Sequence, residues 1–84
     1  MKYSIQIAKT ALKDLSRMPY HYQDKIIKTI RSLALNPRPH GAKKLKGRDA
    51  WRIRVDNYRI IYEIQDDRLI IIVVVVSHRK DAYR

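Results

Sequence analysis

The 84-residue chain contains no cysteine and only two glycines, and it has no hydrophobic run long enough to cross a membrane. Without cysteine there is neither a disulfide framework nor a thiolate metal site, which suits a reducing compartment, so we expect a cytoplasmic protein. The longest unbroken apolar run, Leu69 to Val76, is eight residues, and the N-terminal residues lack the apolar stretch of a signal peptide. A membrane-spanning or secreted protein is therefore not expected.

Acidic residues are also scarce, since 8 Asp and Glu stand against 19 Lys and Arg and give a formal net charge of +11. A field this positive attracts polyanions, which leaves nucleic acid, acidic protein and anionic lipid open as partners. With 45% hydrophobic and 32% charged residues, the composition is that of a folded chain rather than a disordered one. Its length suffices for one small domain, residues 1–84.

The first half of the chain predicts a strand and two amphipathic helices. Residues 3–7 alternate polar and apolar, as in a short, half-buried strand. Thr10 is the expected N-cap of a first helix, which Pro19 stops. A second helix ends at Asn36-Pro37. Its predicted buried face consists of Ile26, Ile27, Ile30, Leu33 and Ala34.

The clearest signal is a β-hairpin formed by residues 51–55 and 58–64, joined by Asp56-Asn57 as a type I′ turn pair. A two-residue loop sets the register and places Arg54 opposite Arg59, with Arg52 on the same face. The arginines are therefore expected to converge on one face of the sheet. The other face carries Trp51 and Tyr58 and is the one that the helices should cover.

A last strand, residues 69–76, follows Asp66-Asp67, which we expect to be a second two-residue turn. This strand is apolar on both parities, as expected of an interior strand covered on both sides. Parity carries His78 onto the arginine face, whereas Arg79 points away unless the chain bends after Ser77. The predicted fold class is α+β: an N-terminal strand, a two-helix hairpin, then an antiparallel sheet with the helices on one face.

Three groups of residues are candidates for function. Three arginines on one face match phosphate oxygens, although solvated surface cations are the alternative. Lys43, Lys44 and Lys46 form an edge strand or basic loop that either contacts a nucleic acid backbone or is simply solvated. The tail adds the imidazole of His78 and the phenol of Tyr83, which suit acid/base chemistry or plain surface and packing roles. His21 and His40 are isolated and no carboxylate cluster occurs, so we expect no metal or organic cofactor.

These features together resemble the RelE/ParE toxin superfamily over essentially the whole chain, and most closely its RelE branch. The resemblance implies a toxin of a type II toxin-antitoxin system that cleaves mRNA in the ribosomal A site without a metal. The segments that carry it are Asn36-Pro37-Arg38, Lys44-Leu45-Lys46-Gly47, Trp51–Val55, Tyr58–Tyr62 and His78-Arg79 to Tyr83.

The resemblance also implies roles for individual residues. Arg59 falls on the arginine that holds the scissile phosphate, and Arg52 and Arg54 fall on cationic positions of the first hairpin strand. Arg79 falls on the arginine that stabilises the transition state, and Tyr83 on the tyrosine that orients the substrate. A guanidinium is a poor general base, so the base is either Tyr83 or His78. Ser77 stands where glycine is usual before the His-Arg pair.

The implied partners are mRNA, the ribosome and a cognate acidic antitoxin similar to RelB, bound in a toxin-antitoxin hetero-oligomer. Two other readings of the sequence remain. One is a ParE-type inhibitor of DNA gyrase with the same fold and no nuclease chemistry. The other is a basic RNA-binding module without catalysis.

Overall fold

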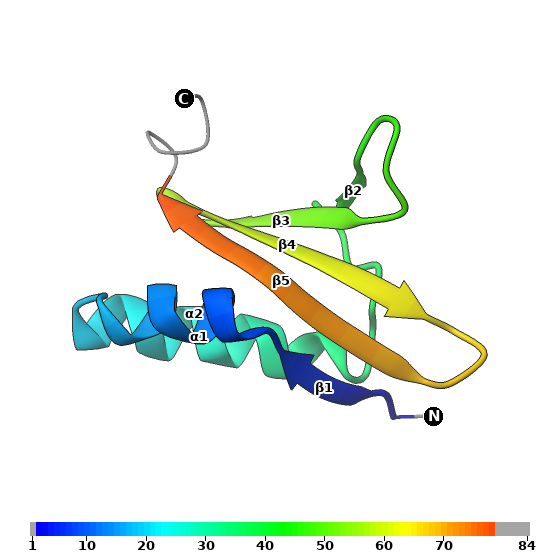
Figure 1. Cartoon of the computed structure of the whole chain (residues 1–84), viewed down its shortest axis with the longest axis horizontal. Coiled ribbons are helices and arrows are strands. Elements are labelled where there is room, and N and C mark those ends of the chain that lie inside the picture. Colours follow the sequence, from blue (N-terminus) through cyan, green and yellow to red (C-terminus); the bar gives the residue numbers. More distant parts are fainter. Residues whose placement is uncertain (1, 79–84) are drawn as a thin grey trace.

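The structure, a computed structural model, describes residues 2–78 as two helices packed on one side of a five-stranded sheet (Figure 1). The strand order is β1-β5-β4-β3-β2, with β1 parallel to β5 and the other neighbours antiparallel. The predicted α+β class is confirmed, and the first strand makes the sheet mixed. The elements are β1 (Ser4–Ile7), α1 (Lys9–Ser16), α2 (Tyr20–Leu33), β2 (Lys43–Lys44), β3 (Trp51–Val55), β4 (Tyr58–Gln65) and β5 (Ile70–His78).

Both helices bury an apolar stripe, and that of α2 is largely the one that the sequence predicts. Ala11 and Leu15 of α1 and Ile26, Ile30 and Leu33 of α2 are buried, whereas Ile27 is only half-buried. They form one core with the buried strand residues. The burial of this apolar surface is the main favourable term in the stability of so small a fold. On the sheet side the core contains Ile60, Tyr62, Ile71, Val73 and Val76.

Thr10 is not the N-cap of α1, contrary to expectation. The helix begins at Lys9 with Ala8 as its N-cap residue, and the Thr10 hydroxyl donates a hydrogen bond to the main-chain carbonyl of Val74 at 3.0 Å. The side chain therefore joins the helix to β5 rather than capping the helix's own backbone.

The β3–β4 hairpin has the predicted register, with Arg54 opposite Arg59 and Arg52 opposite Ile61. The turn type differs from the prediction. Type I′ requires a positive φ at both central residues, but of the two only Asp56 has one, at 53°, which is the pattern of type II′. The Asp56 carboxylate accepts from Lys25 Nζ of α2 at 3.0 Å, so the tip of the hairpin is tied to the helix layer.

The connection between β4 and β5 spans four residues, Asp66 to Leu69, instead of the predicted two. Gln65 pairs with Ile70 at its base. Leu69 adopts a φ of 54°, an uncommon conformation for a leucine, and its carbonyl accepts from the Ser4 N–H of β1 at 2.7 Å. The turn therefore also aligns β1 with β5.

The register between β4 and β5 shifts at Val74. Tyr62 pairs with Val73 and Ile61 with Val75, so Val74 is the extra residue of a β-bulge. Beyond it, Val76 pairs with Ile60 on the helix side. The bulge reverses the parity of Val75 to His78, so His78 does not lie on the face predicted for it.

Candidate nucleic-acid interface

The face of the sheet opposite the helices, here the arginine face, carries four cations. Arg54 and Arg59 are directly opposed, and Arg52 and Lys43 are directly opposed on the next strand pair. Arg54 and Lys43 are exposed, whereas Arg52 and Arg59 are half-buried against the sheet. The predicted convergence of the arginines on one face is confirmed.

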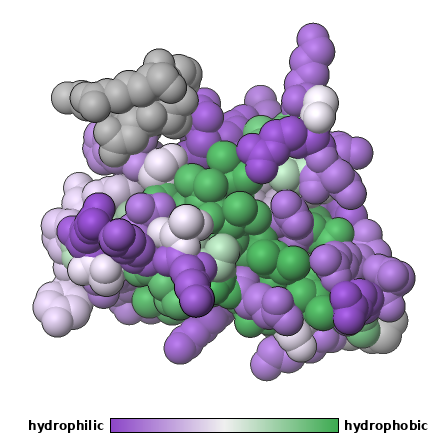
Figure 2. Space-filling model, viewed as in Figure 1, coloured by the Kyte–Doolittle hydropathy of each residue, from purple (hydrophilic) through white to green (hydrophobic). Residues whose placement is uncertain are grey.

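An apolar strip lies beside these cations. Ile61 of β4 and the β5 residues Ile70, Ile72 and Val75 have the same parity as the arginines, and all four are half-buried. β5 is thus an interior strand, but its second face is not covered as completely as the sequence suggested. On the face in view in Figure 2, hydrophobic side chains gather along the course of β5 and hydrophilic ones surround them.

The charge of the arginine face is strongly unbalanced. Among the strand residues of this face that the structure describes, Glu63 is the one carboxylate, against three arginines and one lysine. Directly opposed like charges destabilise a sheet by roughly 0.2–1 kcal/mol. Guanidinium groups stay charged in any environment and bind phosphate oxygens through two parallel hydrogen bonds. This face therefore has the chemistry of a phosphate-backbone binding surface.

The basic segment after the helices is divided between the two faces. Lys43 pairs with Arg52 and lies on the arginine face, whereas Lys44 pairs with Trp51 and lies on the other. Lys46 is exposed in the loop that follows β2. Of these three predicted RNA-binding lysines, the register brings Lys43 alone to the arginines.

His78 lies on the helix side of the sheet, so the parity prediction for it is wrong. It pairs with Tyr58, and the two rings make an edge-to-face contact with centroids 5.2 Å apart. Ser77, rather than His78, lies on the arginine face, where it is directly opposite Arg59. The cause is the bulge at Val74. Whether His78 takes part in catalysis stays a prediction, and Arg79 and Tyr83 lie outside the described residues.

Tyr58 and His78 belong to a chain of aromatic rings that the sequence analysis missed. Tyr22 contacts Tyr58 with centroids 5.1 Å apart, and His21 contacts Tyr22 at 4.0 Å. The chain runs from the start of α2 to the end of β5. Two of its members, Tyr58 and His78, line a cleft of about 320 Å³ together with Asp14, Arg17, Met18, Val76 and Ser77. No spacing along the sequence signals this contact, because the rings come from three separate elements.

A cluster around Asp66 anchors the loop that leads from α2 to β2. The Arg38 guanidinium donates to both carboxylate oxygens of Asp66, at 3.2 and 2.8 Å, and the Tyr3 hydroxyl donates to the same carboxylate at 2.6 Å. These hydrogen bonds, that of Arg38 foremost, lower the pKa of Asp66 to about 2, and the bond to Asp66 raises the pKa of Tyr3.

The same loop is held from the core by Tyr62 and Trp51. The Tyr62 hydroxyl donates to the Pro37 carbonyl at 2.8 Å, and burial raises the pKa of this phenol to about 12. Arg38 lies over the Trp51 ring, 5.2 Å from its centroid. Arg38, which the sequence marked only as part of a motif, is therefore a structural residue of this loop.

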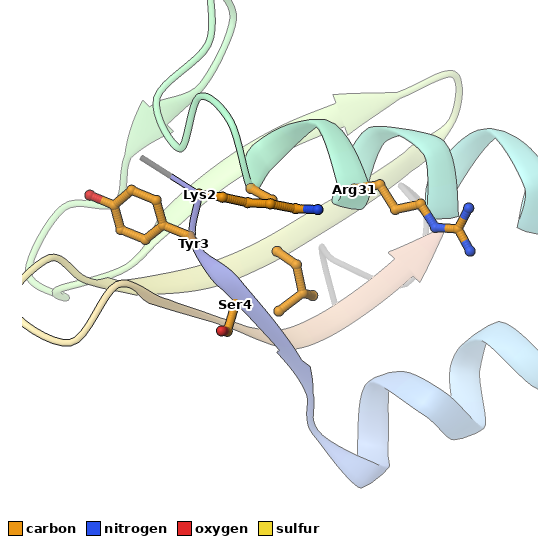
Figure 3. Close-up of a pocket in the computed structure, with 6 residues that line it drawn as sticks. Lys2, Tyr3, Ser4 and Arg31 are labelled. Carbon is orange, nitrogen blue, oxygen red and sulfur yellow. The ribbon is translucent and has the colours of Figure 1, made fainter.

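A cleft of about 630 Å³ lies between β1 and the end of α2, away from Arg52, Arg54 and Arg59 (Figure 3). Figure 3 shows Lys2, in the segment before β1, extending toward Arg31 of α2, whereas Tyr3 points the opposite way. A second cleft of about 450 Å³, lined by Ile5, Ile7, Leu12 and Ile27 among others, adjoins it through Ile5 and Arg31. Both are at the β1 edge, and the cations of β2 and β3 are at the opposite end of the strand order.

Residues 2–78 contain neither a cluster of metal ligands nor a helix that could span a membrane. No group of three or more histidine, aspartate and glutamate side chains in this part of the chain is placed to hold a metal ion. Neither helix described here has the length and apolar character that crossing a bilayer requires.

Comparison with known proteins gives consistent matches over nearly the whole chain. The model of the family described as ParE toxin of type II toxin-antitoxin system, parDE, matches residues 5–83. Toxin RelE3 of Methanocaldococcus jannaschii is 39% identical over 84 residues, covering 94% of this chain and 93% of that protein.

Solved structures of toxin-antitoxin complexes share the fold. In the RelB-RelE antitoxin-toxin complex from Methanococcus jannaschii, the matching chain is 37% identical with a TM-score of 0.73, and 93% of this chain and 94% of that one are covered. In the archaeal RelE-RelB complex from Pyrococcus horikoshii OT3, the matching chain is 26% identical with a TM-score of 0.85. The match covers 94% of this chain and 97% of that one.

Proposed function

Since the chain belongs to the RelE/ParE family of toxins from type II toxin-antitoxin systems, we propose that it is a ribosome-dependent endoribonuclease that cleaves mRNA in the A site. The observation that carries the proposal is the set of opposed cations on the open face of the sheet, with Arg54 across from Arg59 and Lys43 across from Arg52. A surface of this kind favours a phosphate backbone over a neutral protein partner.

The proposed reaction is an in-line transesterification. The ribose 2′-hydroxyl oxygen attacks the adjacent 3′-phosphorus, the bond from phosphorus to the 5′-oxygen of the next nucleotide breaks, and a 2′,3′-cyclic phosphate and a 5′-hydroxyl result. A base removes the proton of the 2′-hydroxyl, and an acid supplies one to the leaving oxygen. No metal ion enters this scheme, so the proposed chemistry needs none at the scissile phosphate.

Each site residue has a role in this scheme. Arg59 holds the scissile phosphate, while Arg52, Arg54 and Lys43 bind the flanking backbone. Arg79 stabilises the charge that develops on the phosphate and assists the leaving oxygen. Lys44 and Lys46 remain sequence-based predictions, because the register supports Lys43 alone.

Tyr83 is the proposed general base. Nearby cations lower the pKa of a phenol toward the physiological range, whereas a guanidinium cannot accept a proton there. His78, the other candidate, lies with Tyr58 on the helix side of the sheet.

A pocket with strong cations but a poorly matched base depends on its substrate being held in line, because orientation then provides much of the rate enhancement. The ribosome would supply this orientation, and the net charge of +11 favours docking on ribosomal RNA. The proposed location is accordingly the cytoplasm.

An acidic antitoxin similar to RelB is the proposed regulatory partner, bound in a hetero-oligomer. Two of the similar structures are complexes of a RelE chain with a RelB chain. The unbalanced charge of the arginine face gives an acidic segment an electrostatic reason to bind this protein.

Inhibition of DNA gyrase without nuclease chemistry is the second candidate. The observation in its favour is that the family model matching residues 5–83 is that of ParE toxins. A non-catalytic RNA-binding module is a third, and it predicts that substitution of Arg59 changes RNA affinity but no cleavage rate.

Primer extension separates these candidates. The purified protein is incubated with an mRNA, alone and on programmed ribosomes, and new 5′ ends are mapped. Cuts confined to the A-site codon and dependent on ribosomes support the proposal. Absence of cleavage in both conditions contradicts it, and inhibition of gyrase supercoiling by the same preparation would then support the ParE reading.

A further inference from the structure

The end of β5 shows that one small polar residue shares the arginine face with the cations. Ser77 is directly opposite Arg59 and is half-buried. Directly opposed residues in an antiparallel pair have Cβ atoms about 4.5–5.5 Å apart. A phosphate group bound at Arg59 would thus have an oxygen within reach of the Ser77 hydroxyl, which is a hydrogen-bond donor.

The position of Ser77 depends on the bulge at Val74. Without the extra residue, the pairing of Tyr62 with Val73 would continue to Val76 opposite Arg59, and strand alternation would carry the bulkier imidazole of His78 onto the arginine face, as the sequence alone suggested. With it, His78 packs edge-to-face on Tyr58 on the helix side, and the arginine face receives a side chain that leaves room for an anion.

The start of α1 satisfies the backbone at this bulge. The Ala8 N–H donates to the Val73 carbonyl at 2.8 Å, and the Thr10 hydroxyl donates to the Val74 carbonyl at 3.0 Å. A bulge disrupts the ladder locally, and each of its polar groups needs another partner. Thr10 is the side chain that provides one, from a helix 64 residues away in the sequence.

We propose that the Ser77 hydroxyl is a further phosphate-binding group beside Arg59, and that Thr10 is the positioning residue that keeps it there by holding the bulge. The inference rests on the proposed function in taking the phosphate to be that of RNA. It adds to the arginines a neutral donor whose removal leaves the net charge unchanged.

The test for Ser77 uses binding, so that it does not depend on cleavage. A fluorescent single-stranded RNA with a deoxyribose at each position that would be cut is titrated with the free protein at low salt. A hydrogen bond to a charged group predicts that Ser77→Ala binds about tenfold more weakly, while Ser77→Thr, which keeps the hydroxyl, stays close to wild type. Ser4→Ala, on the same face of β1, is the matched control.

Equal affinity of Ser77→Ala and the wild type overturns the role of Ser77, as does a wild-type protein that binds no RNA. Failure of the proposed function has a different signature. If programmed ribosomes show no cleavage but the affinity loss of Ser77→Ala persists, the enzyme assignment fails while the binding site stands.

The test for Thr10 adds a structural readout. Wild-type protein is expected to show nuclear Overhauser effects between the rings of Tyr58 and His78. Thr10→Val, which removes the hydroxyl and keeps the shape, should lose them and bind RNA as weakly as Ser77→Ala does. Thr10→Ser should retain both properties.

Thr29→Val is the control for Thr10→Val, since the Thr29 hydroxyl donates to Lys25 within α2 at 3.0 Å. An unchanged ring contact in Thr10→Val overturns the positioning role. Should Thr10→Val fail to fold, the Ser77 variants still decide whether the hydroxyl opposite Arg59 binds phosphate.

Discussion

Arg54 and Arg59 are directly opposed across the β3–β4 hairpin, on the face of the sheet that the helices leave open. Such a pair weakens the hairpin, and the described strand residues of this face supply one carboxylate against four cations. A fold that keeps this arrangement gives up stability for charge density, which is useful when the ligand is a polyanion.

Removal of one charge from this pair should therefore separate stability from function. Arg54→Gln is expected to raise the free energy of unfolding by about 0.2–1 kcal/mol through relief of repulsion. The same variant should bind RNA more weakly, because a phosphate contact is lost. Denaturant unfolding and RNA titration measure the two effects. Arg68→Gln, at an exposed turn position, is the control, and a loss of stability in Arg54→Gln alone would contradict the account.

The neighbouring lysines of β2 offer a matched pair. Lys43 shares the arginine face, and Lys44 lies on the other. Lys43→Gln should weaken RNA binding and reduce the magnitude of the salt slope, log K against log salt, by about 0.7, as expected for one contact to single-stranded RNA. Lys44→Gln should change both quantities less. Equal effects of the two variants would mean that the binding surface does not follow the face of the sheet.

The identity of the general base makes a distinct prediction. On programmed ribosomes, Tyr83→Phe is expected to lower the cleavage rate by about 10²–10⁴, the usual contribution of a positioned base, and to flatten the rise of rate with pH. His78→Gln is expected to keep the wild-type pH profile with a smaller loss. The reverse pattern would assign the base to His78 despite its place beside Tyr58.

The Asp66 cluster predicts a pH dependence of stability. The native pKa of Asp66 is about 2, below the value near 3.9 of an unfolded aspartate. Its contribution is therefore fully present above about pH 4 and is lost as the pH falls through about 2. Asp66→Asn should be less stable than wild type at pH 7, and the difference should vanish in strong acid. Asp67→Asn is the control. A carboxyl titration of Asp66 by NMR that gives an ordinary value would contradict this.

Much of the sheet was predictable because its signals are local. The alternation of arginine and apolar residues in 51–55 and the two-residue connection determine the register and hence the opposition of Arg54 and Arg59. The type of the Asp56-Asn57 turn was predicted wrongly. Type I′ needs a positive φ at both residues, and only Asp56 has one.

The end of β5 could not be predicted for a physical reason. In a run of isoleucine and valine that is apolar on both parities, a shift by one residue costs little hydrophobic burial, so the pattern contains no register information. The shift is instead held by Ala8 and Thr10, which are remote in sequence from Val74. One bulge then moved His78 away from the arginines and Ser77 toward them.

The contacts around Arg38 were missed for a related reason. Tyr3, Arg38 and Asp66 come from β1, the loop after α2 and the β4–β5 turn, and the fold alone brings them together. No spacing along the chain indicates that Arg38 stabilises this loop instead of binding a ligand.

The most direct test of the nuclease assignment is the rate of mRNA cleavage on programmed ribosomes by wild type, Arg59→Ala and Arg68→Ala. We predict cleavage in the A-site codon by the wild type and by Arg68→Ala, and a loss of about 10² or more in Arg59→Ala, as for removal of a transition-state charge contact. Circular dichroism should show that Arg59→Ala is folded. No cleavage by the wild type, or full activity of folded Arg59→Ala, would contradict the central claim.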